Sequence, residues 1–329
     1  MSNAANTGNI KSNSLLKLEN FNVEYRIRGG WLSAVKNVSL SIERGVILAI
    51  VGESGCGKST LAHGIIRLLP EKTTRRRGNV LFEGENLSAL SERKMTAMRG
   101  KNIGMIFQDP MDSLNPVYRS GTQVAEAIYL DKKNREQVWE EVLELYRKVK
   151  IPDADKRLRS FPHELSGGMR QRVMIAMMLS RNPRLIIADE PTTALDVTIE
   201  AQILDIINRL KSDFATSVLL ITHNFGLVAE VADWIAVMYA GEVVEQGEVL
   251  EIFREPRHPY TELLMKALPR RSKLEGRLQT IEGNVPRLMS EKPGCRFSNR
   301  CPLATAECGH EDPPLKQNGK THGYRCHNR

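Results

Sequence analysis

A glycine-rich loop early in the chain has the residue types needed to bind a nucleoside triphosphate. Its pattern is Gly52-x4-Gly57-Lys58-Ser59, and it follows an apolar run and precedes an amphipathic stretch. The glycines let the backbone turn so tightly that several amide N–H groups point at one phosphate. In such a loop Lys58 reaches the β- and γ-phosphates, and the Ser59 hydroxyl binds Mg²⁺. The other predicted contacts of the loop are Ser54, Gly55, Cys56 and Thr60.

Two adjacent carboxylates supply the second half of this chemistry. Asp189 and Glu190 directly follow a short apolar run at residues 185–188. A carboxylate at the end of a buried strand holds Mg²⁺, directly or through water, in phosphate-loop ATPases. Glu190 can then polarise the attacking water, and a positioned base contributes on the order of 10²- to 10⁴-fold to a rate. The two motifs together predict hydrolysis of ATP with Mg²⁺ as the cofactor.

The elements that must position these residues alternate between strands and helices. Residues 46–51, 185–188 and 218–221 are continuous apolar runs, which are typical of strands buried on both faces. Gly241-Glu242 stands between two further apolar runs and predicts a hairpin. The alternation predicts an α/β core with a mostly parallel sheet. A helix is expected at residues 137–150, where one face carries Val138, Val142, Leu145 and Val149.

Composition limits the classes of protein that this chain can be. Its 329 residues can bury a sizeable core, and no apolar run approaches the roughly 18 residues that a membrane span needs. The polar residues 1–14 lack the apolar segment of a secretory signal and are expected to be disordered. The formal net charge of +8 permits nucleic acid or anionic lipid as a partner. The basic residues are spread along the chain, however, which favours a solvated surface.

Four of the five cysteines gather in the last 35 residues. Their spacing is Cys295-x5-Cys301-x6-Cys308-x17-Cys326. Four thiolates suit a [4Fe–4S] cluster or tetrahedral Zn²⁺, and free or air-oxidised thiols are the remaining alternative. The spacing lacks the Cys-x2-Cys pairs of zinc ribbons. Histidines that could replace a cysteine ligand are His310, His322 and His327.

A third motif lies between the phosphate loop and the acidic pair and carries a family resemblance. Its residues are Leu165-Ser166-Gly167-Gly168-Met169, and they open a predicted helix. With this turn, residues from about 16 to 253 resemble the ATP-binding cassette (ABC) ATPases. The resemblance implies that Ser166, Gly167 and Gly168 bind the ATP held by the phosphate loop of a second subunit. Met169 stands where many members of the family have Gln.

The same resemblance implies roles for further residues. Gln108 matches the Q-loop glutamine, which senses Mg²⁺ and the γ-phosphate. Asp196 matches the D-loop aspartate, and His223 matches the switch histidine that contacts the γ-phosphate. The family stacks adenine on an aromatic residue upstream of the loop, for which Tyr25 is the candidate and Trp31 the alternative. The predicted catalytic residues are therefore Lys58, Gln108, Glu190 and His223.

A narrower resemblance rests on four segments, at residues 108–116, 169–172, 258–261 and 293–302. Together they resemble the ATP-binding subunit of oligopeptide and dipeptide ABC importers, and nickel importers share much of the pattern. Some members of this subgroup bind a [4Fe–4S] cluster in their tail. The resemblance thus implies that the ligands of such a cluster are Cys295, Cys301, Cys308 and Cys326.

This resemblance predicts three regions after the lead of residues 1–14. Residues 15–255 are expected to form an α/β phosphate-loop ABC ATPase core with an antiparallel β subdomain. A helical subdomain is expected at about residues 109–180. Residues 256–329 are expected to form a small, irregular, Cys-rich C-terminal domain.

The partners implied are a second ABC ATPase subunit, identical or paralogous, and two transmembrane permease subunits. An extracytoplasmic peptide-binding protein would act indirectly, and the chain would sit peripherally at the cytoplasmic face of the membrane. A soluble ABC ATPase acting on nucleic acid is the alternative from another class, although no aromatic-interleaved basic patch supports it. An iron–sulfur regulator with a vestigial ATPase conflicts with the intact set Lys58, Asp189, Glu190 and His223.

Overall fold

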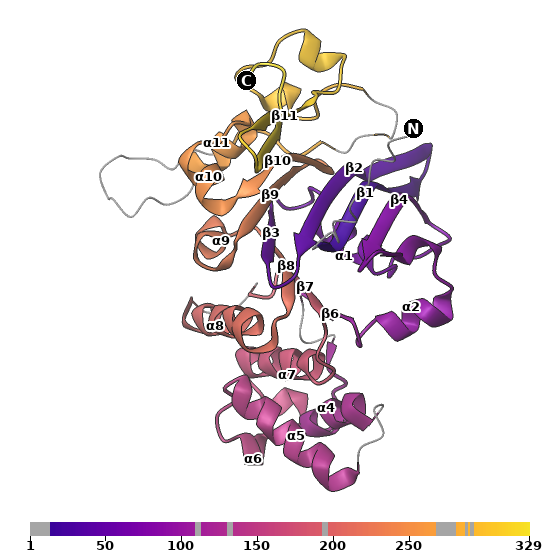
Figure 1. The fold of residues 1–329 in the computed structure, drawn as a ribbon, viewed down its shortest axis with the longest axis vertical. Coiled ribbons are helices and arrows are strands. Elements are labelled where there is room, and N and C mark those ends of the chain that lie inside the picture. Colours follow the sequence, from indigo (N-terminus) through magenta and orange to yellow (C-terminus); the bar gives the residue numbers. More distant parts are fainter. Residues whose placement is uncertain are drawn as a thin grey trace, which may run out of the picture.

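Two β-sheets and several groups of helices form the protein (Figure 1). The computed structural model describes residues 14–108, 113–129, 134–192, 197–267, 281–286, 289 and 293–329. In these ranges the smaller sheet is antiparallel and has the order β2-β1-β4-β5. Its strands are β1 (Ser14–Ile27), β2 (Gly30–Glu43), β4 (Thr74–Phe82) and β5 (Glu85–Asn86).

The larger sheet has the order β11-β12-β10-β9-β3-β8-β7-β6 among the described residues. The strands from β9 to β6 in this order are parallel, and β10, β11 and β12 are joined by antiparallel pairs. The parallel strands are β3 (Ile47–Val51), β6 (Ile103–Ile106), β7 (Leu185–Asp189), β8 (Ser217–Thr222) and β9 (Trp234–Tyr239). The remaining strands are β10 (Glu242–Glu248), β11 (Leu315–Asn318) and β12 (His322–Arg325).

The central strands confirm the expectation drawn from the apolar runs. Every residue of β3, β7 and β8 is buried. Helices cover both faces of a parallel sheet, so a strand within it has no face left for polar side chains. The predicted hairpin is also present, because β9 and β10 pair on either side of Gly241.

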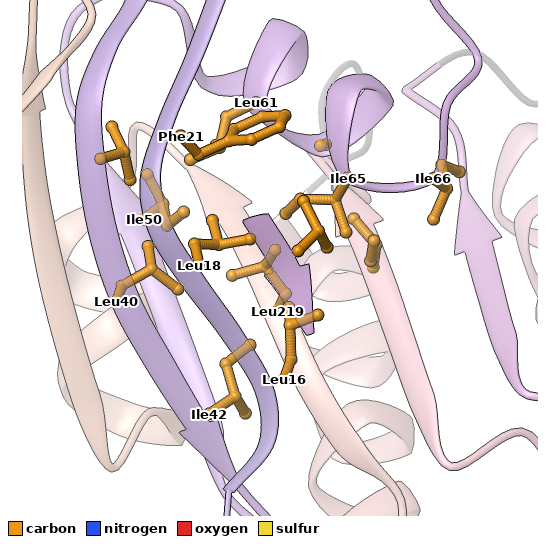
Figure 2. Packing of buried hydrophobic residues seen from close by; sticks show 14 of the residues in the cluster. Leu16, Leu18, Phe21, Leu40, Ile42, Ile50, Leu61, Ile65, Ile66 and Leu219 are labelled. Atoms are coloured by element: carbon orange, nitrogen blue, oxygen red, sulfur yellow. The ribbon is translucent and has the colours of Figure 1, made fainter. Parts of the chain in front are cut away.

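Helix α1 (Lys58–Ile65), which follows the phosphate loop, is held between the two sheets. Figure 2 shows Phe21 of β1 packed beside Leu61 and Ile65 of this helix, above Ile50 of β3. Burying one Leu or Phe side chain contributes about 1.5–3 kcal/mol. This layer therefore fixes the start of α1, where the phosphate loop ends.

A separate helical group lies at one end of the molecule, away from the C-terminal region (Figure 1). It consists of α4 (Ser120–Tyr129), α5 (Arg135–Lys148), α6 (Ala154–Arg157) and α7 (Gly167–Leu179). The apolar face predicted for α5 is buried against α4 and α7. The remaining helices are α2 (Glu92–Met98), α8 (Val197–Phe214), α9 (Phe225–Val231), α10 (Val249–Arg254) and α11 (Pro259–Lys266). Short 3₁₀ turns lie at Leu87–Ala89, Pro162–Glu164, Ser298–Arg300 and Glu307–Gly309.

The C-terminal region is joined to the core through the larger sheet. Strand β12 pairs with β10, and β11 closes a hairpin on β12. The side chain of Phe297 is 1% exposed, and its ring centroid lies 5.0 Å from that of Tyr239 and 5.3 Å from that of Tyr260. Sequence analysis did not predict this hairpin, because its strands carry short, mixed patterns, although Gly319 between them is a turn signal.

Acid should destabilise the contact between the C-terminal region and the core through His258. The Nδ1 atom of His258 accepts the backbone N–H of Tyr260 and caps α11. Burial lowers the pKa of His258 to about 4, although the nearby Glu245 carboxylate opposes the shift. A histidine in an unfolded chain has a pKa of about 6.5. The unfolded state thus binds more protons between these values, and up to about 3 kcal/mol of stability present above pH 6.5 is lost as the pH falls to 4.

Denaturant unfolding at several pH values measures this loss. His258→Asn keeps a side chain that can cap the helix but cannot titrate in this range. The slope of stability against pH between 6.5 and 4 should be shallower in that variant than in the wild type. Equal slopes in the two proteins would assign the acid loss to other groups.

Candidate nucleotide site

The phosphate loop runs from the end of β3 to the start of α1, and two of its glycines are required by close backbone contacts. A Cβ atom at Gly52 would lie 2.1 Å from the carbonyl oxygen of Met238. At Gly57, φ is +106° and a Cβ atom would lie 2.3 Å from the carbonyl oxygen of Ala34. Neither neighbour is the end of a flexible side chain, so the glycines cannot be replaced without moving the backbone. The strand, loop and helix context predicted for this motif is present.

The ammonium group of Lys58 is enclosed by the loop itself. Its Nζ donates to the carbonyl oxygens of Gly52, at 2.8 Å, and Glu53, at 3.0 Å, and the residue is 4% exposed. A pocket of about 410 Å³ opens beside the loop. It is lined by Tyr25, Leu32, Ser33, Ala34, Ser54, Gly55, Cys56, Gly57, Lys58, Ser59, Thr60, Gln108, Glu190, Ala240 and Pro286.

Ser59 and Asp189 supply the oxygen atoms that suit Mg²⁺. The Ser59 hydroxyl donates to Oδ1 of Asp189 at 3.0 Å. Asp189 is 3% exposed, and burial raises the pKa of its carboxyl group, while the Ser59 hydrogen bond opposes this shift. Mg²⁺ prefers a few protein oxygens together with substrate phosphates and water. The donor set therefore fits Mg²⁺.

Glu190 and two other predicted residues, each at the end of a different strand, come together in the site. Its Oε2 accepts from Nε2 of Gln108 at 3.1 Å, and its Oε1 lies 3.5 Å from Nδ1 of His223. Glu190 has φ of +46°, a left-handed conformation that is uncommon for a side chain of this kind. Its backbone N–H donates to the carbonyl of Ile221 in β8 at 2.9 Å, which holds it at the sheet edge. The carboxylate is thus oriented where ligands bind in parallel sheets.

The two aromatic candidates for adenine lie in different surroundings. Tyr25 lines the pocket, and its hydroxyl lies 3.3 Å from Oγ1 of Thr60. Trp31 packs instead against Arg75, whose guanidinium carbon lies 4.3 Å from the centroid of the indole ring. The structure thus brings Tyr25, and not Trp31, to the rim of the phosphate loop pocket.

The Ser-Gly-Gly turn lies elsewhere in this subunit. Ser166 caps α7 by accepting the backbone N–H of Met169 at 3.3 Å. Among the described residues, neither Ser166 nor the two glycines that follow it line the phosphate loop pocket. A Cβ atom at Gly168 would lie 2.6 Å from Cγ2 of Ile199, so α7 and α8 approach closely there. Asp196, the predicted D-loop residue, lies outside the described residues.

Cys56 is a buried packing residue within the loop. It is 1% exposed, and its carbonyl accepts from the N–H of Gly241 at 2.7 Å. A thiol near the start of a helix often has a lowered pKa and is then reactive. Burial instead raises the pKa of Cys56, so the unreactive protonated form is favoured.

The four tail cysteines do not form a ligand group in this structure. In the described residues, which include all four, no three His, Cys, Asp or Glu side chains are arranged to hold a metal ion. Burial raises the pKa of the Cys295 thiol to about 11, so this thiol is protonated in the metal-free chain. Two of the three candidate histidines have other partners, since His322 pairs with Glu245 at 2.7 Å and His327 contacts the carbonyl of Glu311 at 3.0 Å. The predicted iron–sulfur or zinc site is therefore not supported.

Sequence reasoning missed several residues of the pocket. Leu32, Ser33 and Ala34 come from β2, Ala240 follows β9, and Pro286 belongs to the C-terminal region. None of these residue types signals nucleotide binding by itself. The clear alternation of buried and exposed residues lies at the other end of β2, at residues 38–43, so it gave no signal for residues 32–34.

No helix in the described ranges has both the length and the apolar character needed to cross a membrane. The ABC transporter family matches residues 35–193, and the family described as the C-terminal region of oligopeptide/dipeptide transporters matches residues 244–308. The probable peptide ABC transporter ATP-binding protein y4tR of Sinorhizobium fredii is 47% identical over 97% of this chain and 96% of its own length. The oligopeptide transport ATP-binding protein OppD of Bacillus subtilis is 46% identical over 95% of this chain and 88% of its own.

Solved structures agree with these sequence relatives. A dimeric post-hydrolysis structure of the ATP-binding cassette MJ0796 bound to ADP and Pi has a TM-score of 0.64 and 28% identity, over 71% of this chain and 98% of that one. CbiO1 of Clostridium perfringens, part of the ABC transporter complex cbiONQ, has a TM-score of 0.65 and 27% identity, over 74% of this chain and 92% of that one.

The fold and the site define a phosphate-loop ATPase with the architecture of an ATP-binding cassette. Its activity is hydrolysis of ATP to ADP and phosphate. The chain belongs to the family of ABC transporter ATP-binding proteins.

Proposed function

We propose that this ATPase is the nucleotide-hydrolysing subunit of a dipeptide or oligopeptide ABC importer. The observation that carries the cargo class is the match of residues 244–308 to the C-terminal region of oligopeptide/dipeptide transporters. Relatives over nearly the whole chain have names that refer to peptide transport. Coupled to membrane subunits, the hydrolysis at Glu190 would power the movement of peptide.

In this proposal each residue of the site has one task. Lys58 and the loop amides bind the β- and γ-phosphates, and Tyr25 stacks on adenine. Ser59, Asp189 and Gln108 hold Mg²⁺, which neutralises charge on the phosphates when it is bound. Glu190 orients and polarises the attacking water. His223, whose Nδ1 lies 3.5 Å from Oε1 of Glu190, contacts the γ-phosphate from the neighbouring strand end.

The site is completed by a second subunit, identical or paralogous. Ser166, Gly167 and Gly168 lie away from the phosphate loop pocket of their own chain, so the partner's copy of this turn would close over the ATP. The Ser166 hydroxyl and the start of α7 would then face the γ-phosphate. Asp196, the predicted D-loop residue, would contribute to nucleotide binding. The dimeric state of the similar cassette MJ0796 supports this arrangement.

The membrane partners would be two permease subunits, with the chain bound peripherally at the cytoplasmic face. Residues 109–162, which include α4 and α5, would receive the permeases. The helical region would then span residues 109–180 of an ATPase domain at 15–255, with the peptide-importer extension at 256–329. A separate extracytoplasmic protein would select the peptide, so it would affect this chain indirectly.

Transport assays in cells that lack this chain test the cargo. Uptake of labelled dipeptides or oligopeptides should fall, and it should return with the wild-type chain but not with Glu190→Gln. Normal peptide uptake with lost ⁶³Ni²⁺ uptake would establish the nickel importer instead. Normal uptake of both, with salt-sensitive binding of DNA or RNA that stimulates the ATPase, would favour the nucleic acid alternative.

A separate hypothesis for the tail cysteines is that they hold a structural [4Fe–4S] cluster, with Zn²⁺ as the alternative. It rests on the four-thiol spacing, because the geometry gives it no support. Anaerobic purification of the full chain decides it. A brown protein with iron and sulfide would establish the cluster, a colourless protein with one zinc per chain would establish zinc, and a metal-free protein would exclude both.

A further inference from the structure

The phosphate loop is tied to the C-terminal region by an ion pair that no motif predicts. Glu53 is the residue directly after the first glycine of the loop. Arg300 grips its carboxylate with both terminal nitrogens, at 2.8 and 3.0 Å. The Arg300 side chain is 7% exposed and that of Glu53 is 27% exposed. Bidentate guanidinium–carboxylate pairs with little exposure are the strong form of this interaction.

Arg300 is itself held in place on its other sides. Its Nε donates to the carbonyl of Glu282 at 2.8 Å, and one terminal nitrogen donates to the carbonyls of Ile281, at 3.2 Å, and Gly283, at 3.3 Å. The guanidinium also donates to the hydroxyl of Tyr239 at 3.3 Å. The hydrogen bond with Glu53 is the main cause that raises the pKa of Arg300, so the group is charged whenever the loop is folded. The arginine thus meets the loop in a fixed orientation.

A second tether fixes the backbone of the same loop residue. The N–H of Glu53 donates to the Tyr260 hydroxyl at 2.9 Å. Tyr260 lies in α11 and is fully buried, with its ring centroid 4.6 Å from that of Tyr239. Tyr260 and Arg300 therefore hold the backbone N–H and the carboxylate of Glu53, although they lie 207 and 247 positions away in the sequence.

Charge explains why this tether matters for ATP. Glu53 places a carboxylate in a loop that must receive the negative charges of a triphosphate. Like charges repel one another unless a cation neutralises one of them. Lys58 is directed at the backbone carbonyl of Gly52 within the loop, whereas Arg300 is directed at the Glu53 carboxylate.

We propose that Arg300 is a positioning residue for ATP binding, which neutralises Glu53 and holds the phosphate loop in its binding conformation. The C-terminal region is then a working part of the ATP site. This inference rests on the ATPase activity and is independent of the cargo. When the binding conformation is populated for about a tenth of the time, the apparent Kd rises about tenfold.

Equilibrium binding of MgATP to the full-length chain tests the proposal. Arg300→Ala should weaken binding about tenfold, because it releases the loop from the C-terminal region and leaves the Glu53 carboxylate of the phosphate loop without its cation. Arg300→Lys keeps the positive charge but cannot donate two parallel hydrogen bonds to the carboxylate. Its affinity for MgATP should therefore lie between those of the wild type and Arg300→Ala. Adding Glu53→Ala to Arg300→Ala should recover most of the affinity, since the repulsive charge is gone.

The matched control is Arg329→Ala, which breaks another ion pair of the C-terminal region, 2.6 Å from Glu262 of α11. Its ATP affinity should equal that of the wild type. Thermal unfolding of each variant separates weaker binding from loss of the fold. The proposal is overturned if Arg300→Ala binds like the wild type, or if Glu53→Ala gives no recovery in the Arg300→Ala chain. A wild-type chain that bound no MgATP would overturn the ATPase assignment as well.

Discussion

Glu190→Gln should reduce ATP turnover by about 10²- to 10⁴-fold while leaving ATP binding intact. The substitution keeps the size of the side chain and an oxygen that can accept from Gln108, which donates to Glu190 at 3.1 Å. It removes the negative charge that polarises the attacking water. Phosphate release measured with saturating MgATP reports the turnover, and equilibrium binding reports the affinity.

In the proposed cycle ATP closes the dimer and hydrolysis reopens it, so the same variant should collect in the ATP-bound dimer. Gel filtration with and without MgATP shows this as a shift to twice the mass. Glu230→Gln, an exposed carboxylate on α9, is the control and should hydrolyse ATP like the wild type. Turnover near the wild-type rate in Glu190→Gln would remove Glu190 from the role of base.

Lys58→Met should weaken ATP binding by about 100-fold, since hydrogen bonds to charged groups contribute about 1.5–3 kcal/mol each. Methionine fills a similar volume but lacks the ammonium group, which is enclosed beside the carbonyls of Gly52 and Glu53. The loss should appear as a higher Kd and KM for ATP, whereas Glu190→Gln should lower kcat and kcat/KM equally at unchanged affinity.

Binding of MgATP by calorimetry measures this effect. Lys17→Met is the control, because Lys17 lies on β1 and pairs with Glu19 at the surface. That variant should bind ATP normally. An affinity within a factor of about three of the wild type in Lys58→Met would mean that the loop amides alone hold the phosphates.

Much of this site could be read from the sequence because its motifs are local. The phosphate loop is one strand, one turn and one helix start, and the geometry of each follows from neighbouring residues. The α5 face was also readable, since a period of 3.6 residues needs no distant partner. Asp189, Glu190 and His223 needed one further rule, that parallel strands end at the same edge of their sheet.

Other features were not readable, because they depend on partners far away in the chain. Arg300 and Glu53 are separated by 247 residues, and an arginine beside a cysteine signals no contact with a phosphate loop. The β11–β12 hairpin was missed because its stability comes from pairing with β10. The cysteine spacing indicated a metal site, but among the described residues no three possible ligands are arranged to hold a metal ion, and spacing along the chain does not encode that arrangement.

The sequence by itself thus determined that this protein is an ATPase, and it predicted which residues bind phosphate, which hold Mg²⁺ and which activates water. Short motifs carry that information, because the residue types and the spacing that define each motif lie within a few residues of one another. Only the tertiary structure decided that Tyr25 lines the ATP pocket, that Cys56 is buried and inert, and that Arg300 reaches the phosphate loop. Burial and distant pairing depend on how the sheets and helices pack, and no local pattern encodes them.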